Sequence, residues 1–224
     1  MAREQQRATT AGPRSYAPGW WIVMVTLGGM LSLFAPAFGF MVARQLEMPP
    51  WVAYPLIALA GGLMGLVVGV AQAGALDRTV LAVPRAGWTL LTAVGAMVAW
   101  ALGMLPATVD ALGDPLNLDS RRIHAAVIVG LVALVLAVPV LQWLLLRRVV
   151  RHAWRWIPIT VVAGALSLAA ARWGLLLQGG RTSSDLVPAL VVVTVLAFTF
   201  ALVTGAGLGW LARSAVTGRG RRAR

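Results

Sequence analysis

The stretch Trp21-Ile-Val-Met-Val-Thr-Leu-Gly28-Gly-Met-Leu-Ser-Leu decides the reading of this chain, because it occurs three times in related form. It returns as Trp88-Thr-Leu-Leu-Thr-Ala-Val-Gly95-Ala-Met-Val-Ala-Trp and as Trp156-Ile-Pro-Ile-Thr-Val-Val-Ala163-Gly-Ala-Leu-Ser-Leu. The three tryptophans lie 67 and 68 residues apart, and each precedes a pair of small residues by seven positions. A fixed period of this kind indicates an array of one supersecondary unit.

The composition places that array in a membrane. Apolar residues make up 59% of the 224 residues and charged residues 12%, and the mean hydropathy is +0.82. A helix needs about 20 apolar residues to cross roughly 30 Å of hydrocarbon. Uniformly apolar runs of this length predict six transmembrane helices, over residues 20–43, 52–76, 87–107, 123–146, 156–177 and 187–212. We therefore expect an all-α integral membrane protein.

The repeat predicts how these helices are grouped. Each unit is a hairpin in which a helix opened by tryptophan is followed by a helix that ends near arginine. Because all three units begin on the same side, they form parallel repeats and a pseudo-threefold bundle, not the inverted repeats of many transporters. The expected domains are a polar N-terminal tail 1–18, a six-helix domain 19–213 and a basic C-terminal tail 214–224. The repeats within the domain are 19–78, 86–148 and 154–213.

The net charge of +12 serves first as an orientation signal. All 19 basic residues are arginine, and 14 of them lie in the two tails and in the loops on the same side, against four on the other side. The positive-inside rule then predicts a plasma (inner) membrane protein with both termini in the cytoplasm. The arginines of the C-terminal tail are expected to contact anionic lipid of the inner leaflet. Arginines without interleaved aromatic residues predict no nucleic-acid binding.

Residues for catalysis or for a cofactor are missing from the pattern. The chain has no cysteine, so thiolate metal sites and thiol nucleophiles are excluded. His124 and His152 flank the fourth predicted helix at opposite ends, about 42 Å apart at 1.5 Å per residue, so they cannot share one metal. All seven acidic residues fall in tails or loops, which leaves no buried carboxylate for proton coupling. We expect no enzymatic activity and no cofactor.

Three polar residues are candidate solute contacts. Gln72 and Gln142 precede charged pairs at similar offsets and lie about 7–9 Å inside the membrane boundary. Each amide either bonds a neighbouring helix or joins a polar ring on the pseudo-threefold axis. Arg172 is the one ionisable residue within a span, and it either extends toward the membrane surface or has a specific role. Pro139, three residues before Gln142, is expected to kink its helix.

Small residues mark the expected helix contacts, because close backbone approach drives association of helices in lipid. Glycines spaced by four residues form a ladder in the second helix and a shorter one in the sixth. Further small residues follow the repeated tryptophans. The full set is Gly28, Gly61, Gly65, Gly69, Gly95, Ala163, Gly205 and Gly209. Packing is the expected role, and lining of a permeation path is the alternative.

The stretch Gln142-Trp-Leu-Leu-Leu-Arg147-Arg148, followed by Ala153, Trp154 and Trp156, carries a resemblance. It resembles a loosely defined, uncharacterised group of bacterial multi-pass membrane proteins that repeat a Gly-rich helix ending in Gln-Trp-x-x-Leu-Arg. The resemblance implies topology and no activity. The unit around Gln72 departs from the motif, since Ala73 replaces the tryptophan and Asp77 an arginine.

Two functions from different classes fit these observations. The favoured hypothesis is a scaffold or accessory subunit that packs against another membrane protein or against itself, because small-residue faces are abundant and buried charge is absent. The alternative is a small carrier or channel that binds a solute on the axis between the repeats. The state of the bundle centre discriminates them: side chains fill it in a scaffold, whereas a carrier holds a cavity lined by Gln72, Gln142 and threonines.

Overall fold

The computed structural model describes residues 18–77, 79, 81, 83–113, 120–177 and 186–220. The described residues are helical, without strands. Six helical segments among them are long and apolar enough to cross a membrane, as the sequence predicted. The helices are α2 (Pro18–Ser32), α3 (Phe34–Gln45), α4 (Pro50–Leu76), α5 (Arg85–Ala111), α6 (Arg121–Leu146), the short 3₁₀ helix η1 (Ala153–Arg155), α7 (Trp156–Leu177) and α8 (Leu186–Gly220).

Prolines set several helix starts. Pro49 has the extended conformation of an N-cap residue (ψ 151°), and Pro50 occupies the first turn of α4, where no intrahelical donor is needed. Pro84 likewise precedes α5. Arg85 forms an ion pair with Asp77, which joins the two ends of the connection between α4 and α5.

The first span is broken, which the sequence reading of 20–43 as one helix did not anticipate. It consists of α2 and α3, which meet at Leu33. Pro36 explains the break, because proline lacks the N–H that would bond the carbonyl of Ser32 four residues earlier. The Ser32 hydroxyl donates to the Gly29 carbonyl (2.7 Å), which satisfies one backbone acceptor at the break. The C-terminal boundary also differs, since α8 continues to Gly220 beyond the predicted boundary at 213.

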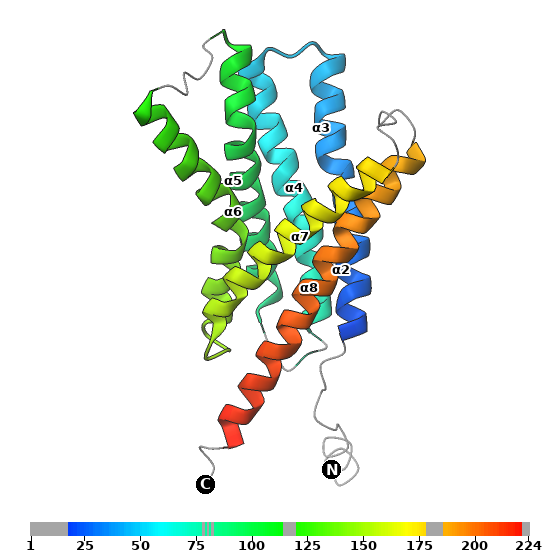
Figure 1. Cartoon of the computed structure of the whole chain (residues 1–224), viewed down its shortest axis with the longest axis vertical. Coiled ribbons are helices and arrows are strands. Elements are labelled where there is room, and N and C mark those ends of the chain that lie inside the picture. The colour runs from blue at the N-terminus through cyan, green and yellow to red at the C-terminus, as the bar shows by residue number, and fades with distance from the viewer. Residues whose placement is uncertain are drawn as a thin grey trace, which may run out of the picture.

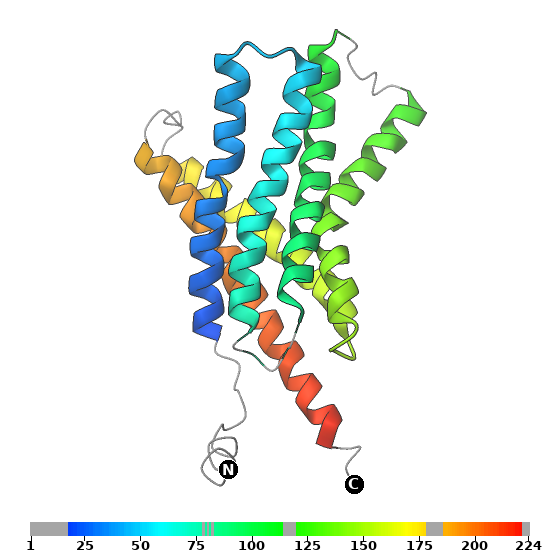
Figure 2. The ribbon, with the colours of Figure 1, turned by 180° about the vertical axis from the view of Figure 1, so that it is seen from behind.

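The spans form a ring in chain order. α2 packs against α4 and α8, α4 against α5, α5 against α6, and α7 against α8 (Figures 1 and 2). α6 and α7 make the sparsest contact between successive spans, and they diverge toward the end of the bundle opposite the two termini. We call the end where both described termini lie the termini end and the other the distal end (Figure 1).

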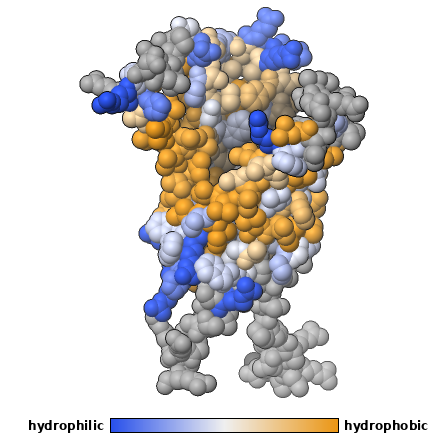
Figure 3. Space-filling model, in the orientation of Figure 1, coloured by the Kyte–Doolittle hydropathy of each residue, from blue (hydrophilic) through white to orange (hydrophobic). Residues whose placement is uncertain are grey.

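The glycine ladder of α4 faces α5. A Cβ atom added to Gly65 would lie 2.7 Å from the Thr92 carbonyl oxygen, and one added to Gly69 would lie 2.9 Å from the Thr89 Cα. Such short distances leave no room for a side chain, so the two backbones touch directly. The outer surface carries a broad apolar band over the helices, as expected for a surface that meets lipid (Figure 3).

Candidate functional site

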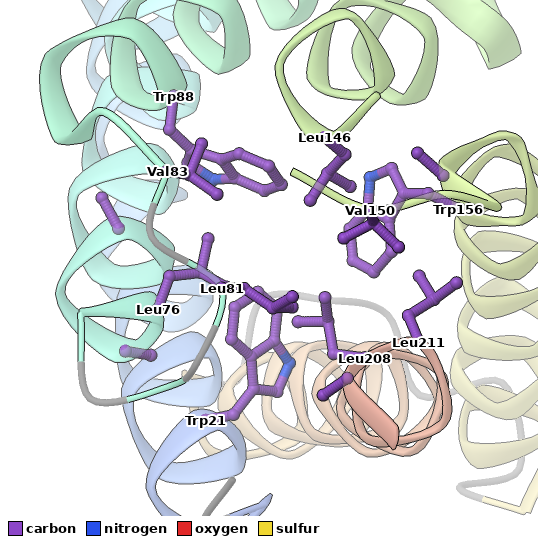
Figure 4. Packing of buried hydrophobic residues seen from close by; sticks show 14 of the residues in the cluster. Trp21, Leu76, Leu81, Val83, Trp88, Leu146, Val150, Trp156, Leu208 and Leu211 are labelled. Atoms are coloured by element: carbon purple, nitrogen blue, oxygen red, sulfur yellow. The ribbon is translucent and has the colours of Figure 1, made fainter. Parts of the chain in front are cut away.

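Three tryptophans meet inside the bundle at its termini end. Trp21, Trp88 and Trp156 are at most 1% exposed, and they point toward one centre from different directions (Figure 4). The ring centroids of Trp21 and Trp156 are 6.4 Å apart, and those of Trp88 and Trp156 are 6.1 Å apart. Both separations suit edge-to-face aromatic contacts. With the leucines packed around them, these residues form what we call the tryptophan cluster: Trp21, Trp88, Trp156, Leu76, Leu81, Leu146, Leu208 and Leu211.

Each tryptophan of the cluster donates its indole N–H to a side chain of another span. Trp88 donates to the Gln72 Oε1 (3.0 Å), and Trp156 donates to the Gln142 Oε1 (2.9 Å). Trp21 donates to the Thr204 Oγ1 (3.1 Å), which connects the first span to the last. These bonds fix the orientation of three buried indoles without any charged group.

The two glutamines are also bonded to each other. The Nε2 of Gln142 donates to the Gln72 Oε1 and to the Thr92 Oγ1, both at 2.9 Å. The Thr92 hydroxyl in turn donates to the Trp88 carbonyl (2.8 Å). Because an indole N–H can only donate, each glutamine must turn its oxygen toward its tryptophan, and the amide orientations are set by the network.

A cavity of about 500 Å³ lies in the centre of the ring, next to this network. All six spans contribute to its lining, which is almost entirely apolar. Its polar lining side chains are Ser32, Gln72, Thr92, Gln142 and Thr160. None of the described residues that line it is ionisable. The volume falls in the range of pockets that bind small organic molecules.

The mouth of the cavity lies between α6 and α7. Val135 of α6 is 41% exposed and Leu168 of α7 is 66% exposed, and both also line the cavity. Figure 3 shows the surface recessed where these helices diverge. At the termini end the tryptophan cluster closes the same space.

The structure brings two of the three candidate solute contacts together. Gln72 and Gln142 are 2% and 1% exposed and share the cavity wall. Arg172 lies apart from them: it is exposed on α7 and is not among the lining residues. Pro139 lies on the cavity wall and leaves the Val135 carbonyl without its usual helical donor.

The small residues named in the sequence analysis lie at helix contacts or are buried. Gly28 faces Ala71 of α4, and Gly61 faces Trp100 of α5. A Cβ atom on Gly95 would lie 2.8 Å from the Val138 Cα of α6. Gly65 and Gly69 contact α5 as described above, and the remaining three, Ala163, Gly205 and Gly209, are buried.

No group of three or more histidine, cysteine, aspartate or glutamate side chains is clustered for a metal within the described residues. His124 lies in the first turn of α6 and His152 directly precedes η1, and both are exposed. Asp114, Asp119 and Asp185 lie outside the described residues, whereas Asp110, expected in a loop, lies in the last turn of α5 and is exposed.

Threonines were expected in the wall of a carrier cavity, but the three individual hydroxyl residues of the site were not identified from the sequence. Thr92 and Thr160 follow Trp88 and Trp156 by four positions, and Thr204 precedes the buried Leu208 by four, as Gln72 precedes Leu76. Spacing from the buried tryptophans and leucines was the available signal. It was hidden because Thr204 differs in type from the two glutamines.

Comparison of the chain with protein-family models, with curated proteins and with solved structures finds no match.

Proposed function

We propose that the protein is a small membrane carrier that takes up a neutral solute in its central cavity. The observation that supports this is the cavity itself, which lies between all six spans and is lined by Gln72, Gln142, Thr92 and Thr160. A bundle that serves only as a scaffold gains nothing from an empty centre, because a void forfeits the dispersion contacts that side chains would make.

The lining indicates which solutes fit. With no ionisable described residue in the wall, an ion would lose its hydration without a compensating charge, so a neutral solute is favoured. The same absence argues for facilitated diffusion over coupling to an ion or proton gradient. The tryptophan cluster would then be the closed gate, and transport would require its indole hydrogen bonds to open.

The pseudo-threefold repeat belongs to the same proposal. Each repeated tryptophan donates to the second helix of the preceding unit, and the bond from Trp21 to Thr204 closes the cycle between the first unit and the last. Three equivalent hydrogen bonds around one centre support three parallel units, 19–78, 86–148 and 154–213, with the solute on their axis.

We propose further that the termini end faces the cytoplasm of a bacterial cell, with the protein in the inner membrane. The 14 arginines that the sequence assigns to the tails and loops of this side support the orientation. Arg155 lies 4.4 Å from the ring centroid of Trp210, and Arg147 lies 5.3 Å from that of Trp143. Such arginine–tryptophan pairs suit the boundary between lipid and water.

Filling the cavity tests the carrier proposal. Gly164 lines the cavity, and a Cβ atom added there meets nothing within 4 Å, so Gly164→Leu occupies the space without moving a helix. Gly174→Leu is the matched control, because Gly174 lies on the same helix in equally open space but away from the lining.

The measurement is thermal unfolding of the protein in nanodiscs with a panel of neutral and charged solutes, since a ligand that binds the folded state stabilises it. Neutral solutes should stabilise wild type and Gly174→Leu but not Gly164→Leu. The stabilising solute should then cross proteoliposomes that contain wild type. Stabilisation by no neutral solute, or equally in both variants, would contradict the proposal.

A second candidate is the accessory subunit that the sequence favoured. The distal half of α6 supports it, because residues on every side of the helix are exposed there: Val127, Ile128, Val129, Leu131 and Val132. A helix of another membrane protein, or of a second copy, could cover this surface. Affinity purification in mild detergent followed by mass spectrometry tests it, and a stoichiometric partner lost on Val129→Trp but kept on Gly164→Leu would favour this role.

A further inference from the structure

We infer that the occupant of the cavity is a neutral membrane lipid that carries a hydrogen-bond-accepting oxygen, held by the Nε2 group of Gln72. This inference rests on the proposed binding role of the cavity and names its ligand class.

The first observation is that the Gln72 amide uses its oxygen, and not its Nε2 group, in hydrogen bonds to the described residues. Its Oε1 accepts from Trp88 and from Gln142, so its orientation cannot be reversed without breaking both bonds. The hydrogen bonds of Gln72 among the described residues use its Oε1 and not its Nε2. The Nε2 atom is not one of the fully enclosed side-chain atoms without a partner, so it reaches the open space of the cavity, where a ligand oxygen can accept from it.

The second step is the surroundings of that donor. Gln72 lines the cavity, so a ligand oxygen placed there would satisfy it. The other glutamine offers no equivalent group, because its Nε2 is committed to Gln72 and Thr92. A ligand recognised here therefore presents one acceptor oxygen, such as an ester or ketone carbonyl, to Gln72. Apart from Ser32, Thr92 and Thr160, the rest of the wall is leucine, valine, alanine, methionine, phenylalanine, glycine and proline, which suits an apolar chain.

The third step is the route. The mouth lies between α6 and α7, and its exposed residues, Val135 and Leu168, are apolar. Both residues lie near the middle of helices that are long and apolar enough to cross a membrane, and a mouth at that depth faces acyl chains. A molecule that reaches the cavity by this path is already dissolved in the bilayer, which favours a lipid over a water-soluble solute.

Photolabelling in vesicles tests the inference. The probe is palmitic acid methyl ester with a diazirine on its chain, and its control is the hydrocarbon of equal length with the diazirine at the same carbon. The full-length protein is reconstituted in phosphatidylcholine vesicles, irradiated with each probe and digested, and adducts are located by mass spectrometry. We expect the ester to label α6 and α7 peptides that contain Val135 and Leu168 about fivefold more than the hydrocarbon does, the factor for one neutral hydrogen bond.

Two variants assign the preference to Gln72. Gln72→Met keeps the length of the side chain but removes the N–H donors, and it should lower the ester-to-hydrocarbon ratio to about one. Thr204→Val is the matched control: it also deprives one indole of its acceptor, but Thr204 does not line the cavity. It should keep the fivefold ratio.

The possible outcomes separate the lipid inference from the carrier proposal. Equal labelling of the cavity by both probes in wild type overturns the inference but leaves a binding cavity, and this comparison stands even where Gln72→Met does not assemble. Labelling confined to the outer surface, with none of it displaced by excess methyl palmitate, overturns the inference. If neutral water-soluble solutes still stabilise the protein in that case, the carrier proposal survives it.

Discussion

The termini end and the distal end of the bundle differ in how the space between the helices is used. At the termini end, indole rings and leucines fill it, and hydrogen bonds run from Trp21, Trp88 and Trp156 to three other helices. Toward the distal end α6 and α7 diverge, and the same central space is a cavity open at one side. The ring therefore opens toward the distal end between α6 and α7, while α4 and α5 stay joined there by the hydrogen bond from the Tyr54 hydroxyl to the Ala101 carbonyl.

The apolar environment of a lipid bilayer explains why the helices need such contacts at the termini end. Apolar side chains gain little by leaving lipid for a protein interior, so association depends on close backbone approach and on interhelical hydrogen bonds. The helices have both toward the termini end, in the glycine ladder of α4 and in the amide network around Gln72 and Gln142. Toward the distal end, α6 and α7 have neither kind of contact with each other.

The largest expected effect comes from a substitution in the close interface. Gly69→Leu places a side chain where Thr89 Cα and Thr92 Cβ are 2.9 and 3.1 Å from the new Cβ atom, so α4 and α5 must separate. We expect a loss of about 3 kcal/mol or more in the free energy of unfolding, at the upper end for overpacked sites. Titration with sodium dodecyl sulfate in mixed micelles measures it.

The control for Gly69→Leu is Gly130→Leu on α6. A Cβ atom there meets nothing within 4 Å, so the change should stay within about 0.5 kcal/mol. If the two variants lose equal stability, the contrast between the ends of the bundle is wrong.

A smaller effect is expected at the tryptophan cluster. Trp88→Phe removes the indole donor to Gln72 and part of a fully buried ring, and it should cost about 2 kcal/mol in the free energy of unfolding. Trp173→Phe is the matched control, since Trp173 is 66% exposed on α7 and should tolerate the change. Equal unfolding midpoints for the two variants would show that the tryptophan cluster does not stabilise the termini end.

The amide pair comes next in magnitude. Gln142→Leu breaks the bonds to Gln72, Thr92 and Trp156, and at about 0.6 kcal/mol for each membrane hydrogen bond the expected loss is about 1–2 kcal/mol. The double variant Gln72→Leu with Gln142→Leu should cost less than the sum of the single changes, because the bond between them is counted twice. Strict additivity in a double-mutant cycle would mean that the two amides do not interact.

The sequence predicted the part of this structure that depends on length and hydropathy. Six spans follow from apolar runs, and burial of Gln72 and Gln142 within them follows from their position. The break at Leu33 was missed because Pro36 alone does not show whether a membrane helix will kink or separate. The tryptophans that open the predicted hairpins lie together at the termini end, but an aromatic belt does not predict that they are buried in the core. Their indole N–H groups find acceptors only through tertiary packing, which no local pattern encodes.

The smallest predicted effect tests whether the first and last spans close the ring by the same kind of bond as their neighbours. Thr204→Val keeps the shape of the side chain but removes the acceptor of the Trp21 indole, so the expected loss is about 0.6 kcal/mol, the average for one membrane hydrogen bond. Thr108→Val is the control, because the Thr108 hydroxyl bonds only the Met104 carbonyl within its own helix and the change should leave stability nearly unaltered. The Trp21 environment offers a second readout, since loss of its acceptor should shift the indole N–H resonance of this residue in nuclear magnetic resonance spectra. A resonance that stays in place would mean that the Trp21 indole is not bonded to Thr204, and the cyclic pattern of three equivalent bonds would reduce to two.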